Sequence, residues 1–570
     1  MQGILPLYFM VSFGGAIAET PPPPKNMVGP RHSQHYSHDG WGNNLAQPHL
    51  GSAGRPRIRS HPPLTSYIDG VSKPRTESDG LPPAWRVSSE LFRGSARPKE
   101  SKGVSQLLLY FGQMVVHDLM RTEMSSEDGE AMHISCGGAG TCGEHGTGVV
   151  TGFGFGCPAA AFGGGGGVLP FFRALRSNTT PGEPQSPINY ESSFLDLSML
   201  YGLEAYSSKS KLRSGVGGRM MLDTYTGLPP RDVDTGLYIV ADLRTRGTPG
   251  LLVLTSLFIH YHNLCADAHR DSNQTFTDDE LYRLARMDNI AAYQHIVEEV
   301  YVPTVLGDHL GPYEGYDKSV DPSIDVFFST CAFRYGHSGL SGLVRLVHPS
   351  FRPMAEDPML LRDVFNNTEK IMDELGARVA ATAILRGLAF EPAQAIDAYF
   401  VKDVALFTGH MSVMNIQRSR DNGLPTYNDA RDWFDMGRVK TFEELAGNDV
   451  AVSAALRELY DSVDDVDAYV GALLEAPNAS TFVLGPLMMA SIKDQFRRLR
   501  DGDRLWYKGR LTPEEQIKLP SLKKMLIDAF GEDDMEQFPS DSFAAVSVAL
   551  GGSPQRTYNS TFILLRWVYT

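Results

Sequence analysis

One stretch of the sequence decides the fold class, Gly103-Val-Ser-Gln-Leu-Leu-Leu-Tyr-Phe-Gly-Gln-Met-Val-Val-His-Asp118. Its apolar residues recur at helical spacing, which predicts a buried α-helix. Gln113 and His117 are four residues apart, so both side chains project from the same face of this helix. Buried polar groups need hydrogen-bonding partners. Spacing alone leaves two interpretations of His117, a satisfied core histidine or part of a functional site.

Helices are predicted along much of the remaining chain. Apolar residues recur at helical spacing in the segments 104–121, 250–269, 278–306, 370–390 and 481–499. Capping-box patterns begin at Thr277, Thr441 and Thr512, and Pro513 suits the first position of a helix. Hairpin dipeptides between alternating apolar residues are scarce, and no internal repeat is visible. The prediction is a mainly α-helical protein with long irregular loops and little β structure.

Composition and length limit the function classes. The chain has 570 residues, which fits one very large domain or two or three smaller ones, and 42% apolar residues provide for a sizeable core. Its net charge is −15 and its basic residues are scattered among acids, which argues against nucleic-acid binding. After the N-terminal segment no stretch approaches about 18 uninterrupted apolar residues, so no transmembrane helix is expected.

The N-terminus has the pattern of a secretory signal over residues 1–18. Apolar residues run from Ile4 to about Ile17, and Ala16-Ile17-Ala18 supplies the small residues that a signal peptidase accepts. A buried N-terminal segment is the alternative. Sequons for N-glycosylation begin at Asn178, Asn273, Asn366, Asn478 and Asn559. Together these features predict a secreted glycoprotein.

The cysteines and a glycine run occupy one loop region. Three cysteines lie in a Gly-rich segment, where a local disulfide suits oxidising conditions: Cys136, Cys142 and Cys157. Cys265 and Cys331 make the count odd, which leaves at least one free thiol or an intermolecular bridge. The run Gly163–Gly167 is not followed by Gly-Lys-Ser/Thr, so it is interpreted as a flexible insertion and not as a phosphate-binding loop.

Five segments resemble one protein family, in the family's order. Phe111-Gly-Gln-Met-Val-Val-His-Asp118 resembles the distal haem motif of the animal-type haem peroxidases, the family of myeloperoxidase, lactoperoxidase and peroxidasin. The others resemble its calcium loop, distal arginine segment, proximal histidine motif and a further signature: Ser192–Gly202, Asp242–Arg244, Phe333–His337 and Asn415–Asn428. The resemblance implies a single large haem-peroxidase domain over residues 35–545, after a Pro-rich segment 19–34 and before a C-terminal tail 546–570.

The resemblance implies a haem b held from the proximal side by His337. This residue would ligate the haem iron, and Asn415 would accept the other ring N–H, which fixes the tautomer. Arg334 and Arg418 are candidates for pairing with the haem propionates, a bidentate task that suits guanidinium. Ordinary salt bridges are the alternative for both arginines.

On the distal side the resemblance implies catalytic roles for three residues. Neutral His117 would take a proton from peroxide and return it to the leaving oxygen. Arg244 would stabilise the charge that develops as the O–O bond breaks, and Gln113 would hold water or a small anion. The implied activity is reduction of hydrogen peroxide and oxidation of a small-molecule reductant, such as a phenol, iodide, bromide or thiocyanate, through a ferryl intermediate.

The resemblance also implies a bound calcium ion. Alternate residues of one extended turn supply hydroxyl, carbonyl and carboxylate oxygens, which suit Ca²⁺: Ser192, Phe194, Asp196 and Ser198. Asp118 would add a second carboxylate and would place the ion beside the distal histidine. The alternative is an ordinary turn formed by Asp and Ser without a metal.

The sequence departs from the family at the positions that link haem covalently in many members. The ester-forming carboxylates are replaced by Val116 and Gly247, and Thr248 stands at the position of a sulfonium-forming methionine. None of the three can form the bond. We therefore expect haem b to be bound non-covalently and to oxidise easier donors than chloride.

Two other functions stay open. Fatty-acid dioxygenases of the same superfamily also lack the covalent links, but they have a radical-forming tyrosine three residues before the proximal histidine, where this chain has Arg334. The neighbouring Tyr335 belongs to the ordinary peroxidase pattern. The other alternative is a non-enzymatic peroxidase-like ectodomain, which the presence of His117, Arg244, His337 and Asn415 disfavours.

Overall fold

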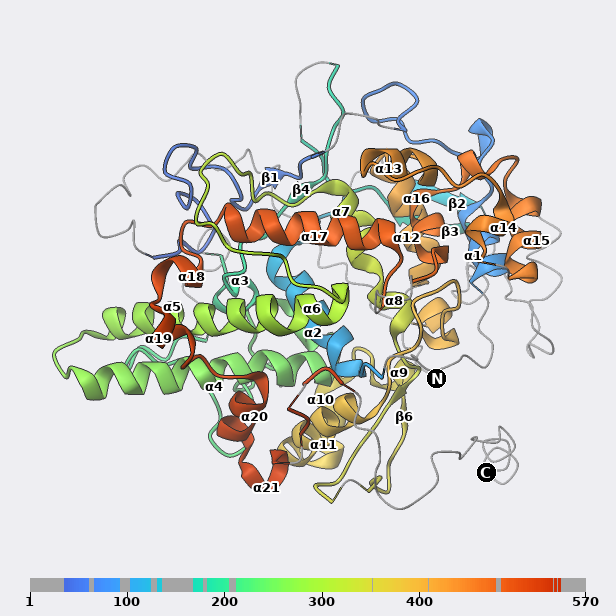
Figure 1. Ribbon diagram of the computed structural model, residues 1–570. Helices are drawn as coiled ribbons and strands as arrows, with labels where there is room; N and C mark the ends of the chain where they lie inside the picture. Colours follow the sequence, from blue (N-terminus) through green and yellow to red (C-terminus); the bar gives the residue numbers. More distant parts are fainter. Residues whose placement is uncertain are drawn as a thin grey trace.

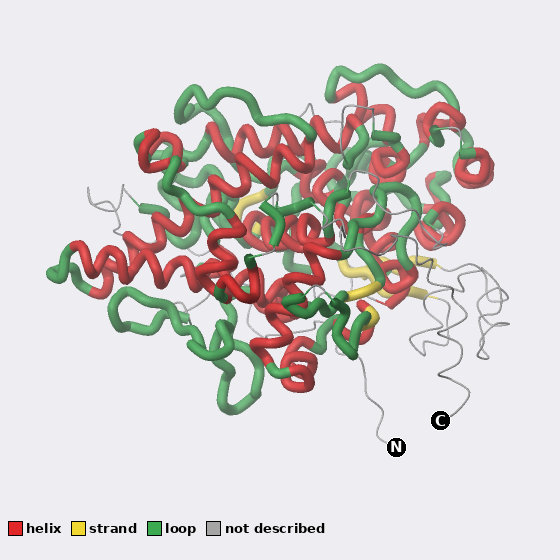
Figure 2. The backbone as a smooth tube through the Cα atoms, turned by 60° about the horizontal axis from the view of Figure 1, so that its bottom comes forward, coloured by secondary structure: helices red, strands yellow, loops and turns green. Residues whose placement is uncertain are grey.

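The computed structural model describes residues 35–60, 66–92, 103–124, 131–135, 168–177, 182–203, 212–350, 352–407, 410–447, 449–477, 483–536, 538–540 and 542–544. Over these residues the chain forms one mainly α-helical domain with long loops (Figures 1 and 2). The signal-like residues 1–18, the Pro-rich segment 19–34, the loop with three cysteines and Gly163–Gly167 lie outside the described residues. No helix of the described part is long and apolar enough to cross a bilayer.

The helices vary from one turn to more than six turns. Up to residue 390 they are α1 (Ala84–Leu91), α2 (Gln106–Leu119), α3 (Ser198–Tyr201), α4 (Pro249–Ser272), α5 (Asp278–Ile296), α6 (Val302–Leu306), α7 (Val326–Thr330), α8 (Gly336–Gly339), α9 (Leu361–Val364), α10 (Thr368–Leu375) and α11 (Ala377–Phe390). After residue 410 they are α12 (Met411–Asp421), α13 (Tyr427–Trp433), α14 (Phe442–Leu445), α15 (Val450–Leu459), α16 (Ala468–Leu474), α17 (Pro486–Asp501), α18 (Tyr507–Arg510), α19 (Pro513–Gln516), α20 (Leu522–Phe530) and α21 (Glu532–Met535).

The strands of the described residues form small antiparallel pairs. These pairs are β1 (Arg55–Pro56) with β4 (Ile188–Asn189), β2 (Ala131–Ser135) with β3 (Val168–Phe172), and β5 (Leu343–Val344) with β6 (Met359–Leu360). Figure 2 shows how little of the fold they occupy. The expectation of little β structure is confirmed.

The helical predictions from periodicity hold for the long helices. α4 and α5 lie side by side, and α5 continues through a π-helical turn, Val297–Tyr301, into α6 (Figure 1). The boxes at Thr277 and Thr512 both form, whereas Thr441 only accepts the hydrogen bond of the Glu444 amide. The segment predicted as one helix over 370–390 is two helices, because Gly376 between them has φ +79°.

Helix α2 lies in the core and carries the quoted stretch. Nearly all of its residues are buried, as the apolar periodicity predicts. At its N-terminal end the Gln106 amide donates to the carbonyl of Gly339 at 3.1 Å, and its oxygen accepts from the Ser341 amide. These bonds tie the start of α2 to the segment that contains α8. The fold thereby fixes two distant parts of the chain, around residues 106–119 and 336–341, against each other.

Candidate functional site

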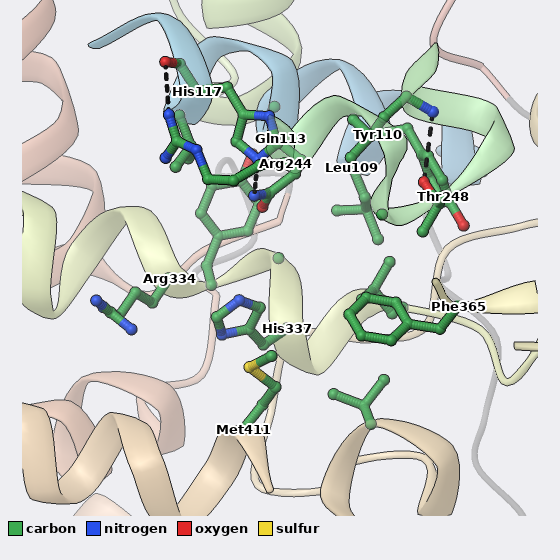
Figure 3. Close-up of a pocket in the computed structure, with 18 of the residues that line it drawn as sticks. Leu109, Tyr110, Gln113, His117, Arg244, Thr248, Arg334, His337, Phe365 and Met411 are labelled. Atoms are coloured by element: carbon green, nitrogen blue, oxygen red, sulfur yellow. Dashed lines mark hydrogen bonds between the residues drawn. The ribbon is translucent and has the colours of Figure 1, made fainter. Parts of the chain in front are cut away.

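A cavity of about 320 Å³ lies between α2 and the segment that contains α8. Figure 3 shows His117, Gln113 and Arg244 on one side of it and His337 on the other. The remaining wall is largely apolar and includes Leu109, Leu251, Leu340, Leu361, Phe365, Val404 and Met411. A largely apolar cavity with a few convergent polar groups is typical of a cofactor or small-molecule site.

His337 lies in a distorted helical segment that places its ring at the cavity. Helix α7 is capped by Asp325, which accepts from two backbone amides, and the chain kinks at Phe333 before α8 begins. Phe333 stacks on Phe328 with ring centroids 4.7 Å apart, which holds the kink. Burial, and then the charge of Arg334, lower the pKa of His337 to about 3, so the imidazole is neutral. No described residue forms a hydrogen bond with Nε2, so this atom is free to act as a metal ligand.

Asn415 on α12 contacts His337, but with the opposite polarity to the one expected. Arg334 Nη1 donates to Asn415 Oδ1 at 2.8 Å, which turns the amide nitrogen toward the histidine. Asn415 Nδ2 lies 2.9 Å from His337 Nδ1 and 2.8 Å from the Tyr469 hydroxyl. In this arrangement Asn415 donates to the ring, whereas the sequence-based expectation was that it would accept. The guanidinium of Arg334 is the physical reason.

His117 lies near the C-terminal end of α2, one turn after Gln113. The Gln113 amide nitrogen donates to His117 Nε2 at 2.8 Å, so this ring nitrogen carries a lone pair. Burial, and then the charge of Arg244, lower the pKa of His117 to about 3. A neutral imidazole with its lone pair toward the cavity is suited to accept a proton.

Arg244 is fixed by an aspartate two residues earlier in the chain. Its Nε and Nη2 bind the Asp242 carboxylate at 2.5–3.0 Å, Nη2 also donates to the His117 carbonyl, and Nη1 donates to the Met120 carbonyl at 2.8 Å. A guanidinium has five N–H groups. Among the described residues these bonds leave one N–H of Nη1 uncommitted. The arrangement offers a rigid cationic donor beside His117.

Two acids near Arg244 were not singled out from the sequence. Burial raises the pKa of Asp242, but Arg244 more than offsets this and holds it at about 2. Burial raises the pKa of Glu191 to about 8, although Arg121 and Arg244 lie 3.6 and 3.8 Å away and act to lower it. Asp242 was visible in the matched segment, whereas nothing local distinguishes Glu191.

The residues expected to bind calcium come together next to the distal helix. Ser198 Oγ donates to the Asp118 carbonyl at 2.7 Å, and Ser192 Oγ donates to Asp196 Oδ2 at 2.9 Å. Both aspartates are fully buried. Asp118 Oδ2 has no hydrogen-bond partner among the described residues, and burial raises the pKa of Asp118 well above its usual range.

Phe194, whose backbone carbonyl was the expected calcium ligand, lies in the same loop. Its backbone N–H donates to Ser192 Oγ at 3.2 Å, and its ring packs beside Gly40 and Gly51. The described residues contain no group of three or more His, Cys, Asp and Glu side chains spaced to hold a metal ion. A calcium site here therefore depends on hydroxyl and backbone oxygens in addition to the two carboxylates.

Arg418 differs from Arg334 in its surroundings. It is not among the described residues that line the cavity, and its Nη1 binds Asp421 at 2.9 Å. Its guanidinium also lies 4.2 Å from the ring centroid of Phe171. The structure thus gives Arg418 an ordinary buried ion pair, the alternative considered for it, while Arg334 lines the cavity and has no carboxylate partner among the described residues.

The positions of the missing haem-linking residues all line the cavity. Val116, Gly247 and Thr248 are part of its wall. A Cβ atom on Gly247 would meet only Asn366 Oδ1, at 3.8 Å, so the cavity has room for a side chain there. Of the described residues that line the cavity, only Asn366 is exposed, which places the first residue of a sequon at its rim.

The residues present fit haem. Among the described residues, the cavity offers an imidazole nitrogen without a protein partner, on His337, and a guanidinium without a carboxylate, on Arg334. Iron binds neutral imidazole, and haem carries propionates that arginine binds well. The opposite wall supplies His117 and Arg244 as proton acceptor and cationic donor.

Solved structures of other proteins share this fold. Peroxidase A from Dictyostelium discoideum superposes with a TM-score of 0.77 at 24% identity, over 90% of this chain and 99% of that one. A fatty acid α-dioxygenase from Arabidopsis thaliana superposes with a TM-score of 0.74 at 18% identity, over 93% of this chain and 86% of that one. The fold is therefore of a class that includes both peroxidases and fatty-acid dioxygenases.

The sequence comparisons narrow this class. Residues 35–543 match the family model described as animal haem peroxidase, so the chain belongs to the animal haem peroxidase family. A dual oxidase from Drosophila melanogaster is 30% identical over 85% of this chain, and a thyroid peroxidase from Sus scrofa is 29% identical over 88%. The chain spans 32% and 59% of the length of these two relatives.

Proposed function

We propose that the chain is a haem peroxidase that reduces hydrogen peroxide and oxidises small donors. One observation carries the proposal: neutral His117 and fixed Arg244 face His337 across one apolar cavity. His337 would hold the haem iron through Nε2, and Arg334 would bind a propionate. When bound, haem supplies the electrons that reduce the O–O bond and stores the oxidising equivalents that the donor later removes.

The residues of the chain supply the proton transfers and the charge stabilisation. Peroxide that enters the cavity displaces the Gln113 amide from His117 Nε2, which then takes a proton from the near oxygen and returns it to the leaving oxygen. The uncommitted N–H of Arg244 Nη1 is a donor for the developing negative charge. Since Asp242 and two backbone carbonyls already hold the guanidinium, little reorganisation is needed.

On the proximal side the proposal requires a change at Asn415. Iron ligation through Nε2 places the imidazole proton on Nδ1, which then needs an acceptor. Asn415 must turn its amide over to present Oδ1 to His337, and Arg334 must release that oxygen. A propionate that binds Arg334 would replace the hydrogen bond that its guanidinium loses to Asn415 Oδ1.

Calcium binding, non-covalent haem, secretion and N-glycosylation are further parts of the proposal. The two buried carboxylates of Asp118 and Asp196, with the hydroxyls beside them, suit Ca²⁺ better than an empty turn, because burial without a counter-charge is costly. With Val116 and Gly247 in the cavity wall, haem b would be held without ester links, and iodide, bromide, thiocyanate or phenols would be more suitable donors than chloride.

A fatty-acid dioxygenase is the second candidate, favoured by the fold similarity and by the apolar cavity wall. Two observations disfavour it. Arg334 stands where the radical-forming tyrosine would be, and the hydroxyl of Tyr335 is bonded to that of Tyr301 at 2.8 Å. The purified, haem-loaded chain should consume peroxide with iodide or a phenol and should form no hydroperoxide from linoleate under oxygen; the reverse pattern would establish the dioxygenase.

A matched pair of variants tests the catalytic residues. His117→Ala and Arg244→Met should each retain haem and lower peroxide turnover by at least about 10²-fold, the usual scale for loss of a general acid–base group or of a donor to developing charge. His269→Ala, at a partly exposed pair with Asp288 far along α4, should leave turnover unchanged. Equal turnover in all three variants would refute the assigned roles.

A further inference from the structure

Residues 35–60 bring a buried arginine, Arg57, to Ser329, a residue that also binds the cavity-lining Arg334. Arg57 follows β1 and is only 4% exposed. Its Nη1 donates to Ser329 Oγ at 3.2 Å and its Nη2 to Thr122 Oγ1 at 2.6 Å, while its Nε has no partner in the part of the chain that the structure describes. No carboxylate pairs with Arg57 among the described residues. A buried cation without a counter-charge is costly, so its retention calls for an explanation.

The contacts of Arg57 connect it to both sides of the cavity. Ser329, whose hydroxyl binds Arg57, also accepts through its carbonyl from Arg334 Nε at 3.2 Å. Thr122 lies in the extended segment after α2, between Met120, whose carbonyl binds Arg244, and Met124, whose sulfur binds Arg418. Three alternate residues of this segment, Met120, Thr122 and Met124, are therefore each contacted by a different arginine.

Among the described residues around Arg57 and Arg334, buried arginines outnumber the carboxylates that pair with them. Asp242 compensates Arg244. A single buried carboxylate, that of Asp421, is shared by three arginines: Arg173, Arg176 and Arg418. Arg57 and Arg334 have only neutral partners among the described residues. Consistent with this excess, burial and the neighbouring arginines lower the pKa of Arg57 to about 9.

We propose that Arg57 is a further haem-positioning residue, and that Arg57 and Arg334 together compensate the two propionate charges of haem. Two guanidiniums that lack carboxylate partners match a ligand with two carboxylates, and the hydroxyl of Thr122 is a donor beside them. This assignment rests on the proposed haem site. It explains why two buried arginines have no carboxylate partner among the described residues: Arg334, which lines the cavity, and Arg57, which shares Ser329 with it.

The test measures haem affinity and haem-free stability in the full-length chain. Arg57→Met should lower the affinity for haem at least about tenfold, equivalent to about 1.4 kcal/mol, by titration of the Soret band. The same variant should raise the urea midpoint of the haem-free protein, because it removes an uncompensated buried charge. Arg57→Lys, which keeps the charge, should restore part of the affinity.

Haem dimethyl ester, in which both propionates are neutral, completes a double-mutant cycle. Wild type and Arg57→Met should bind the ester with equal affinity. The control Arg420→Met breaks a buried pair with Asp467 away from the cavity, so it should destabilise the haem-free protein without changing haem affinity.

The outcomes separate this assignment from the proposed function. Equal haem affinity of wild type and Arg57→Met would overturn the assignment, as would an equal loss of affinity for haem and for its ester together with a lowered urea midpoint, the pattern of a purely structural residue. A wild-type chain that leaves the Soret band of added haem unshifted would contradict the proposed function itself, and the assignment with it.

Discussion

Replacement of Asn415 by aspartate tests the electrostatics of the proximal side. Asn415 is fully buried and connects Arg334, His337 and Tyr469. An aspartate of the same shape would place a carboxylate 2.8 Å from a guanidinium that has no carboxylate partner among the described residues. It would also accept from the Nδ1–H of His337 without having to turn over. The new carboxylate would then pair with Arg334 and also accept a hydrogen bond from His337.

The expected gain follows from opposing effects. A hydrogen bond to a charged group contributes about 1.5–3 kcal/mol, and an unpaired buried charge costs about 3–5 kcal/mol. Desolvation of the new carboxylate offsets much of this, so we expect Asn415→Asp to raise the free energy of unfolding of the haem-free protein by about 1–2 kcal/mol. In the haem-loaded protein the carboxylate makes His337 a stronger donor, so the ferric–ferrous midpoint potential should fall.

Urea unfolding at pH 7 measures the first effect, and spectroscopic redox titration measures the second. Asn415→Leu is the matched control, because it removes all the hydrogen bonds of the amide and adds no charge; it should be less stable than wild type. The reasoning is refuted if Asn415→Asp is no more stable than wild type, or if its midpoint potential is unchanged.

Further predictions concern calcium, haem attachment, acid stability and glycosylation. Chelation should lower the unfolding midpoint of wild type, by the equivalent of about 2.7 kcal/mol if calcium was present at 100 times its Kd, whereas Asp196→Asn should not respond; an equal response would exclude this site. Acidified acetone should extract all the haem, and haem that stays with the protein would disprove non-covalent binding. Because burial lowers the pKa of His117 and of His337 to about 3, the unfolded chain binds protons between pH 6.5 and 3 that the folded chain does not. The free energy of unfolding of the haem-free protein should therefore fall toward acid, by up to about 1.4 kcal/mol per pH unit for each histidine, and a smaller slope in His337→Gln is the check. In protein from a glycosylating host, Asn366→Gly should speed the oxidation of bulky donors but not of iodide, while Asn273→Gln, at the far end of α4, should change neither.

Periodicity and capping patterns could predict the long helices because those signals are local. α2, α4 and α5 bury their apolar residues as expected, and Pro249 at the start of α4 suits the first turn. The break at Gly376 escaped prediction, since the apolar pattern continues across it. Short segments such as α8 owe their form to packing around the cavity, which no local pattern records.

The same contrast between what a sequence pattern records and what tertiary packing decides applies to the functional site. The resemblance pointed to several polar residues that the structure places around the cavity, including His117, Arg244, Arg334 and His337, but not to most of its apolar wall. It could not predict which way the Asn415 amide faces, because that depends on Arg334, 81 residues away in the chain. The sequence did not single out Arg57, since an arginine in a segment rich in Pro and Arg is expected on the surface. Only the tertiary structure shows that it is buried.

The measurement that tests the central claim most directly is the resonance Raman and absorption spectrum of the haem-loaded chain with and without His337. Wild type should show an iron–histidine stretch in the ferrous state, and His337→Gly should lose it and regain a histidine-like spectrum with added imidazole. His117→Ala should keep the stretch. An unchanged spectrum in His337→Gly, or loss of the stretch in His117→Ala, would contradict a haem held by His337 and faced by His117.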